Sequence, residues 1–309
     1  MTWARLAFKL QPASIGFAAF VCLALAGAAL WLTADMRSVL EACGTPDEPK
    51  ACQVIFAFQD THGQAVIMTQ MGIGLAMYGI PLVLGVPILT REIEHRTAMI
   101  AWPLAGSRLK WLAWRVGPVL VVALVLIGLL AFAADQLMQA YFPRDDIGFY
   151  GYEARGLPMV MRATLVLVLG VVVGAVIGRL LPSLLVGIGL CVVVSTALSA
   201  ALPQWVPSAE LTGTEAENFG PGPLRTGGAY RLAGGQLISA QEAEILMQEL
   251  YEESDGAEPD PALLPQQVMY GVAADRYPEV LIRESAAIGG ATLLAGGMAA
   301  VVVRRRRPE

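Results

Sequence analysis

Residues 116–138 read VGPVLVVALVLIGLLAFAADQLM and contain one charged side chain, Asp135, near the end of the run. About 20 apolar residues, at a rise of about 1.5 Å each, cross the hydrocarbon core of a bilayer as a helix. A soluble domain breaks its apolar runs into shorter pieces with charged residues. This stretch therefore predicts a membrane-spanning helix and sets the class of the whole chain.

Five further runs have the same character and lie at residues 13–33, 67–89, 158–178, 182–202 and 284–303. The chain is 56% hydrophobic and 15% charged, against about 25% charged in a typical soluble domain. Pro81 is a candidate kink in the second run, because membrane helices tolerate proline where neighbours satisfy the freed carbonyl. The first run is too long for the apolar part of a signal peptide. We predict an all-α integral membrane protein with six transmembrane helices.

The basic residues set the orientation, because cytoplasmic loops carry an excess of Lys and Arg. An even number of spans places both termini on one side. That side has 12 basic residues against three acids, whereas the other side has 9 against 23. We therefore expect the termini, the segment 90–115 and the turn at Arg179 in the cytoplasm. The chain then divides into spans one to five (1–202), an extracellular loop (203–283), and span six with a basic tail (284–309).

The four cysteines fall into two groups. Cys22 and Cys191 lie inside spans, where a cysteine is by default a small apolar residue. Cys43 and Cys52 share the first exterior loop, where a disulfide is chemically allowed. Two free thiols or a metal pair are the alternatives, with His62 as the nearest further ligand. We favour the disulfide and expect no metal site.

Three local patterns predict packing and turns. Gly170, Gly174 and Gly178 recur at four-residue spacing in span four, and small residues on one face let helices approach closely in lipid. The short link GRLLPS (178–183) predicts that spans four and five form an antiparallel hairpin. In the extracellular loop, Ser239 and Glu242 form a capping-box pattern before a helical repeat. A Pro/Gly-rich section, GPGPLRTGGAYR (220–231), precedes it. The loop could serve as a lid, a partner contact or a spacer.

Common catalytic motifs are absent from the sequence. There is no G-x-x-x-x-G-K-[ST] phosphate loop, no H-E-x-x-H and no G-x-S-x-G. Asp135 and Arg162 lie near the exterior ends of spans three and four, where we expect them to reach water. The spans otherwise hold almost none of the acids and bases that ion-coupled transporters need near the bilayer centre. If the chain transports, a partner should supply the energy, and we expect no cofactor in the chain itself.

Residues 90–115, TREIEHRTAMIAWPLAGSRLKWLAWR, form the largest cytoplasmic element between spans. Thr97 and Ser107 are candidate helix N-caps, and the sequence between them contains a Pro/Gly turn. Topology explains the basic residues, and anchoring at the interface explains the tryptophans. Neither explains Glu92 and Glu94, because acids contribute little to orientation and are unfavourable next to an anionic leaflet. This mixed-sign cluster suggests a docking surface for a protein.

The run GVPILTREIEHRTAMIAWPLAGSRLKWLAWR (85–115) resembles the segment after the second span in ABC-2 type transporter permeases. It is most similar to the actinobacterial branch, in which an acid-rich RE-x-E precedes Thr, Trp and Ser-Arg. Three further features fit that branch: the paired cysteines, the large loop before the last span, and ADRYPEVLIRES (274–285) leading into that span. The chain departs from the pattern at Arg96, where a Gly is expected before the Thr.

The resemblance implies the permease subunit of a bacterial ABC exporter, a multi-pass protein of the cytoplasmic membrane. Its implied partners are a second permease copy, as homodimer or heterodimer, and two ATPase subunits that bind ATP and Mg; no nucleic acid is involved. By position, the residues implied to contact the ATPase are Arg91, Glu92, Glu94, Arg96 and Thr97. Those implied to fix the angle of this coupling helix are Trp102, Ser107 and Arg108.

The sequence leaves the substrate and two rival functions open. The faces of the spans are mostly Leu, Val, Ala and Gly, which suit an apolar or amphipathic cargo but equally suit lipid. A non-transporting sensor or assembly factor on the same fold is the main alternative. A membrane-embedded enzyme fits less well, because the spans show no polar catalytic groups at matched depth.

Overall fold

The computed structural model describes residues 11–42, 49–95, 97, 107–142, 147–212, 222–253, 259–260 and 263–306. The chain forms two compact units. The first unit comprises residues 1–144, 151–199 and 281–309, and the second comprises residues 145–150 and 200–280.

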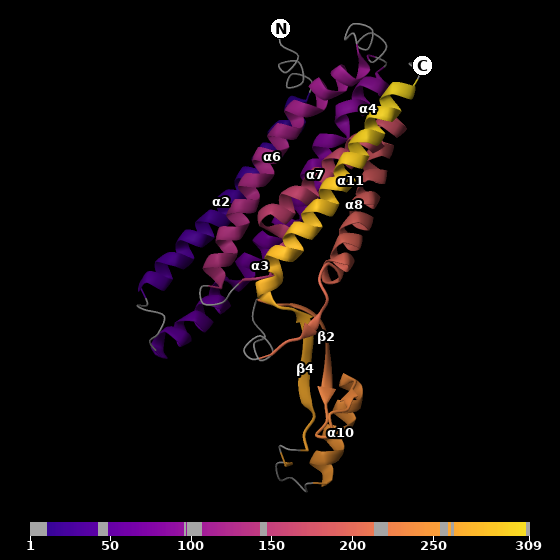
Figure 1. The fold of residues 1–309 in the computed structure, drawn as a ribbon. Helices are drawn as coiled ribbons and strands as arrows, with labels where there is room; N and C mark the ends of the chain where they lie inside the picture. The colour runs from indigo at the N-terminus through magenta and orange to yellow at the C-terminus, as the bar shows by residue number, and fades with distance from the viewer. Residues whose placement is uncertain are drawn as a thin grey trace. The chain divides into compact units, whose positions relative to one another are not determined.

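Long helices run side by side in the first unit (Figure 1). They are α2 (Pro12–Ala42), α3 (Pro49–Gly85), α6 (Arg108–Tyr141), α7 (Gly156–Ile177), α8 (Leu180–Ala201) and α11 (Tyr277–Arg305), with the short α4 (Pro87–Glu94) after α3. Within the described residues, six helices are long and apolar enough to cross a membrane. They are Pro12–Val39, Thr61–Glu94, Arg108–Tyr141, Gly156–Ile177, Leu180–Gln204 and Ala274–Arg305. The six predicted spans are thereby confirmed as helices.

The first exterior loop, predicted between the spans 13–33 and 67–89, is shorter in the structure than predicted. Helix α2 continues to Ala42 and α3 begins at Pro49, so most of that loop consists of helical extensions of the spans. These extensions contact each other, because His62 Nε2 lies 2.8 Å from Asp35 Oδ2. The predicted disulfide cannot be placed: Cys43 and the side chain of Cys52 lie outside the described residues.

Helix α3 contains Pro81, the candidate kink, and ends at Gly85. The helix continues through Pro81, and Val86 still donates its N–H to Leu82 O at 3.0 Å. Pro87 has no N–H to continue this hydrogen-bond ladder, and it becomes the first residue of α4. A proline at the first position of a helix costs little, because that N–H is unsatisfied anyway.

Glycines let α7 approach α3 and α4 closely. A Cβ on Gly174 would lie 2.8 Å from Val86 O, and one on Gly170 would lie 3.3 Å from Val86 N. Gly178 has another role, since it ends α7 with a left-handed backbone (φ 71°) that a residue with a Cβ rarely adopts. With Arg179 it forms the tight turn into α8, as the predicted hairpin requires.

Burial is uneven among the helices. Of the most apolar window in α7, 61% is buried, whereas only 6% of that in α8 is buried. Helix α8 contacts α3 and α7 through a small cluster in which Leu180 and Leu184 pack against Leu82, Val86 and Val166. The rest of α8 presents exposed apolar side chains, a surface that lipid or another protein chain must cover.

The second unit contains a β-sheet, which the all-α prediction did not include. Strands β1 (Ala209–Glu210), β2 (Leu224–Arg231), β3 (Leu237–Ile238) and β4 (Gln266–Val272) pair antiparallel in the order β1-β4-β2-β3. Helix α10 (Ala240–Glu253) begins with the predicted capping box. Ser239 N donates to Glu242 Oε2 at 2.8 Å, and Glu242 N donates to Ser239 Oγ at 3.3 Å. Both capping hydrogen bonds are therefore present.

Candidate functional site: the α4 end of the helical unit

Helix α4 is buried at its start and exposed at its end. Its first turn, Pro87 to Thr90, is buried, and the Thr90 hydroxyl donates to Val86 O at 2.8 Å. Glu94 and His95 are exposed. The Thr97 hydroxyl donates back to Glu92 O at 3.2 Å, so it satisfies a carbonyl of α4. The helix predicted to follow Thr97 lies outside the described residues.

Glu92 connects α4 to α6 through an ion pair with Arg115. Only 12% of the Glu92 side chain and 10% of the Arg115 side chain are exposed. The second oxygen of Glu92, Oε2, is buried and has no hydrogen-bond partner within the described residues. Glu92, one of the two acidic residues that the membrane topology did not explain, therefore forms an ion pair within the chain.

Glu94 connects α4 to α8. Its Oε2 accepts a hydrogen bond from the backbone N–H of Leu180, the first residue of α8, at 3.1 Å. The first N–H groups of a helix have no partner within the helix, and the helix dipole favours a negative charge there. Glu94 therefore caps α8 from outside the helix.

Two arginines at the same end bind the carboxyl ends of helices. Arg108 Nη1 donates to the carbonyls of Val303 (3.4 Å), Arg304 (3.0 Å) and Arg306 (2.8 Å) at the end of α11. Arg306 Nη1 in turn donates to the carbonyls of Ala175 and Val176 in the last turn of α7. Cations at these positions satisfy open carbonyls and complement the helix dipole.

The remaining predicted residues divide into exposed, half-buried and undescribed ones. Arg91 is half-buried and makes contacts within the chain. Ser107 is exposed and precedes α6 with an extended backbone, but its hydroxyl makes no capping hydrogen bond, contrary to expectation. Arg96 and Trp102 lie outside the described residues. The structure thus brings together Glu92, Glu94 and Arg108 through their partners at one end of the helical unit.

A family model described as ABC-2 membrane transporter related matches residues 17–203. The chain belongs to this family. The match covers more than half of the 309 residues and includes α4 with its contacts on α6, α7 and α8. The resemblance to ABC-2 type permeases carried by residues 85–115 is thereby confirmed. Curated proteins and solved structures gave no match.

One feature of this ABC-2 family member lies in the α7–α11 contact and was not predicted. Arg162, expected to reach water, is fully buried. Its Nε and Nη2 donate to Glu284 Oε1 at 3.1 and 2.6 Å, and its Nη1 lies 3.0 Å from Glu153 Oε2. Glu284 stands 122 positions away in the chain, so no local pattern shows the pair. One signal of this pair is present in the sequence: Arg162 and Glu284 are charged residues of opposite sign that each lie within a predicted apolar run.

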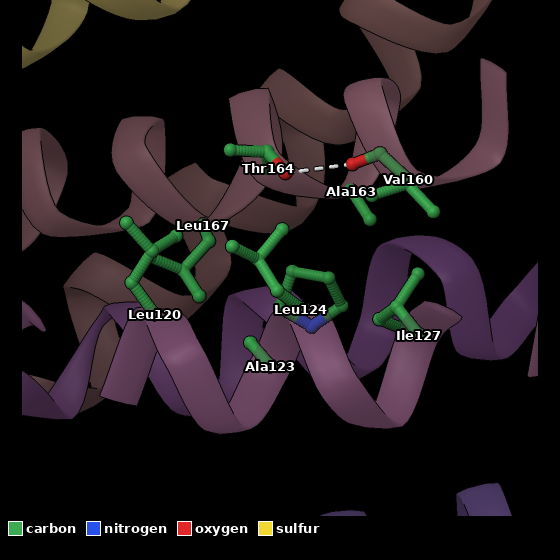
Figure 2. A pocket seen from close by; sticks show the side chains of 9 residues that line it. Leu120, Ala123, Leu124, Ile127, Val160, Ala163, Thr164 and Leu167 are labelled. Carbon is green, nitrogen blue, oxygen red and sulfur yellow. Dashed lines mark hydrogen bonds between the residues drawn. The ribbon is translucent and has the colours of Figure 1, made fainter. Parts of the chain in front are cut away.

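Two cavities in the helical unit differ in size. Figure 2 shows Leu120, Leu124 and Ile127 of α6 facing Val160, Ala163 and Leu167 of α7. These residues line a cavity of about 10 Å³. Thr164 is satisfied there, because its hydroxyl donates to Val160 O at 2.7 Å. A gap of that volume is at the lower limit for one water molecule.

The second cavity is a groove of about 330 Å³ between α3 and α8. Its lining comprises Leu75, Tyr78, Gly79, Leu82, Ile188, Cys191, Val192 and Ser195. Most of these side chains are apolar. The hydroxyl of Ser195 is already used, because it donates to Val192 O at 3.0 Å. The groove is large enough for an alkyl chain, in keeping with the volumes of small-molecule sites.

Proposed function

We propose that this chain is the permease subunit of an ABC exporter that moves an apolar or amphipathic substrate. Two cytoplasmic ATPase subunits and a second permease copy complete the transporter. The family match and the six apolar helices support this function. The lack of a phosphate loop in the sequence supports an energy source in partner chains.

The attachment of α4 to its neighbours is the observation that carries the proposal. Glu92 ties α4 to α6, Glu94 ties it to α8, and Val86, just before α4, lies against Gly174 of α7. A force on the exposed end of α4 therefore acts on three membrane-spanning helices at once. In the proposed mechanism, ATP binding draws the ATPases together, and α4 passes that movement to the spans at the permease dimer interface.

The structure changes which residues of α4 are suited to contact the ATPase. Glu92 is turned toward Arg115, so its role is to hold α4 against α6. The described side chains exposed beside it are Glu94, His95 and Thr97. We expect the ATPase to contact these three, with the positive charge of the basic tail (304–307) on the same proposed cytoplasmic side.

Site-specific photo-crosslinking tests this function. A benzoylphenylalanine at His95 should form an adduct with a P-loop ATPase when the chain is expressed with its native partners. The same probe at Gln64, an exposed position of α3 about 30 residues and roughly 45 Å of helix away, is the matched control. An absent adduct at His95, or an equal yield at Gln64, would rule out α4 as the docking element.

A further inference from the structure

The Arg162 cluster has more negative than positive charge. One guanidinium faces two carboxylates, those of Glu284 and Glu153. Arg162 and Glu284 are 0% and 1% exposed, whereas the Glu153 side chain is 35% exposed and can be hydrated. Buried charges in proteins are normally paired, and charged groups inside a membrane-spanning bundle mark functional sites by default.

The hydrogen bonds between Arg162 and Glu284 use only one of the two carboxylate oxygens of Glu284. Both Nε and Nη2 of Arg162 donate to the same oxygen, Glu284 Oε1. The other oxygen, Glu284 Oε2, is buried and has no hydrogen-bond partner within the described part of the chain. A carboxylate oxygen can only accept, so the group that fits here is a hydrogen-bond donor, and the surplus negative charge favours a cation.

An apolar groove lies next to this cluster. Tyr78 lines the α3–α8 groove, and its hydroxyl is buried within electrostatic reach of Arg162. The groove walls are otherwise mostly aliphatic, with Ile188 and Val192 more than half exposed at its rim. Tyr78 thus lines the apolar groove and also lies within electrostatic reach of Arg162 and Glu153 of the cluster.

We propose that this cluster and groove form a binding site for an amphipathic amine. The ammonium group donates to Glu284 Oε2 and balances the second carboxylate, and the alkyl part occupies the α3–α8 groove past Tyr78. An anionic head group would be repelled by the surplus carboxylate, and a hydroxyl would leave the charge unbalanced. The inference rests on the proposed permease function, in that it names the substrate class of that permease.

Equilibrium binding to the full chain tests the site without the ATPase. The chain is placed in phosphatidylcholine nanodiscs, and binding of radiolabelled dodecylamine, dodecanol and laurate is measured relative to empty nanodiscs. We expect dodecylamine to bind the wild type about tenfold or more tightly than either other probe, as a charged hydrogen bond implies. Glu284→Gln should weaken only amine binding, by a similar factor.

A second pair of variants guards against misfolding of Glu284→Gln. Val192→Trp fills the groove at an exposed position, whereas Val193→Trp adds the same side chain at an equally exposed neighbour that does not line it. Val192→Trp should lower binding of dodecylamine, and Val193→Trp should leave it unchanged. Equal binding of the three probes, or equal effects of the two tryptophans, overturns the site. An adduct at His95 without amine preference would refute this site and leave the permease function standing.

Discussion

The ion pair between Glu92 and Arg115 is predicted to hold α4 onto α6, and a double-mutant cycle measures how strongly. Glu92→Gln leaves the Arg115 charge in a site where 10% of its side chain is exposed. Arg115→Met leaves the Glu92 carboxylate with 12% of its side chain exposed. Removing one partner of a buried pair costs about 3–5 kcal/mol, because the other charge stays buried without compensation.

The double variant, Glu92→Gln with Arg115→Met, removes both charges together. We therefore expect it to be less destabilised than either single variant, because a neutral pair in a buried site is often as stable as the ion pair. The coupling free energy, which is the cost of the double variant minus the summed costs of the two single variants, should therefore be at least about 3 kcal/mol in magnitude, at the upper end of the range for residues in direct contact.

Reversible unfolding in mixed micelles of a mild detergent and sodium dodecyl sulfate gives these free energies. Glu92→Gln combined with Arg37→Met serves as control, since Arg37 is exposed near the far end of α2, where its side chain donates to Gln136 and, among the described residues, makes no hydrogen bond to α4. The control pair should be additive within about 0.5 kcal/mol. Additivity of the same quality for Glu92 and Arg115 would refute the view that this pair fastens α4.

Further predictions concern packing, pH and the cysteines. Gly174→Ala should destabilise the protein by about 1–3 kcal/mol, because its Cβ would lie 2.8 Å from a backbone carbonyl, whereas Gly128→Ala, with open space around it, should be neutral or stabilising in the same unfolding assay. Hydrogen bonds from its capping partner lower the pKa of the Glu242 carboxyl below its ordinary 4.5. That stabilisation is therefore present above pH 4.5 and lost as the pH falls through the folded-state pKa; hydrogen exchange in α10 should be faster in Glu242→Gln than in wild type at pH 6, with the difference vanishing at low pH. A thiol reagent should label Cys43 and Cys52 only after reduction, and labelling without reductant would exclude the disulfide.

The spans could be predicted from sequence because lipid imposes one simple requirement. A helix must present about 20 apolar residues in a row, and each of the six runs does so. The α7–α8 hairpin and the α10 capping box were likewise encoded by a few adjacent residues. The sheet was missed because β1 and β3 have two residues each and β2, LRTGGAYR, includes two glycines that weaken a strand pattern.

The site could be predicted only in part, because its contacts are long-range. The mixed charges at 90–97 located α4, but the partner of Glu92 is 23 positions away and that of Glu94 is a backbone N–H of another helix. The same limit concealed Arg162, whose predicted exposure to water was wrong. A single sequence shows a charge near the end of a span, but it does not show the second helix that buries it.

The central claim is that α4 and the ends of α7 and α8 move together when ATP binds to the partner subunits. Pulsed electron paramagnetic resonance with spin labels at His95 and Arg179, both exposed, tests it in the assembled transporter. The His95-to-His95 distance between the two permease copies should differ between the nucleotide-free and ATP-bound states, while the distance from His95 to Arg179 within one copy stays constant. An unchanged distance between copies, or an equal change within one copy, would contradict the account.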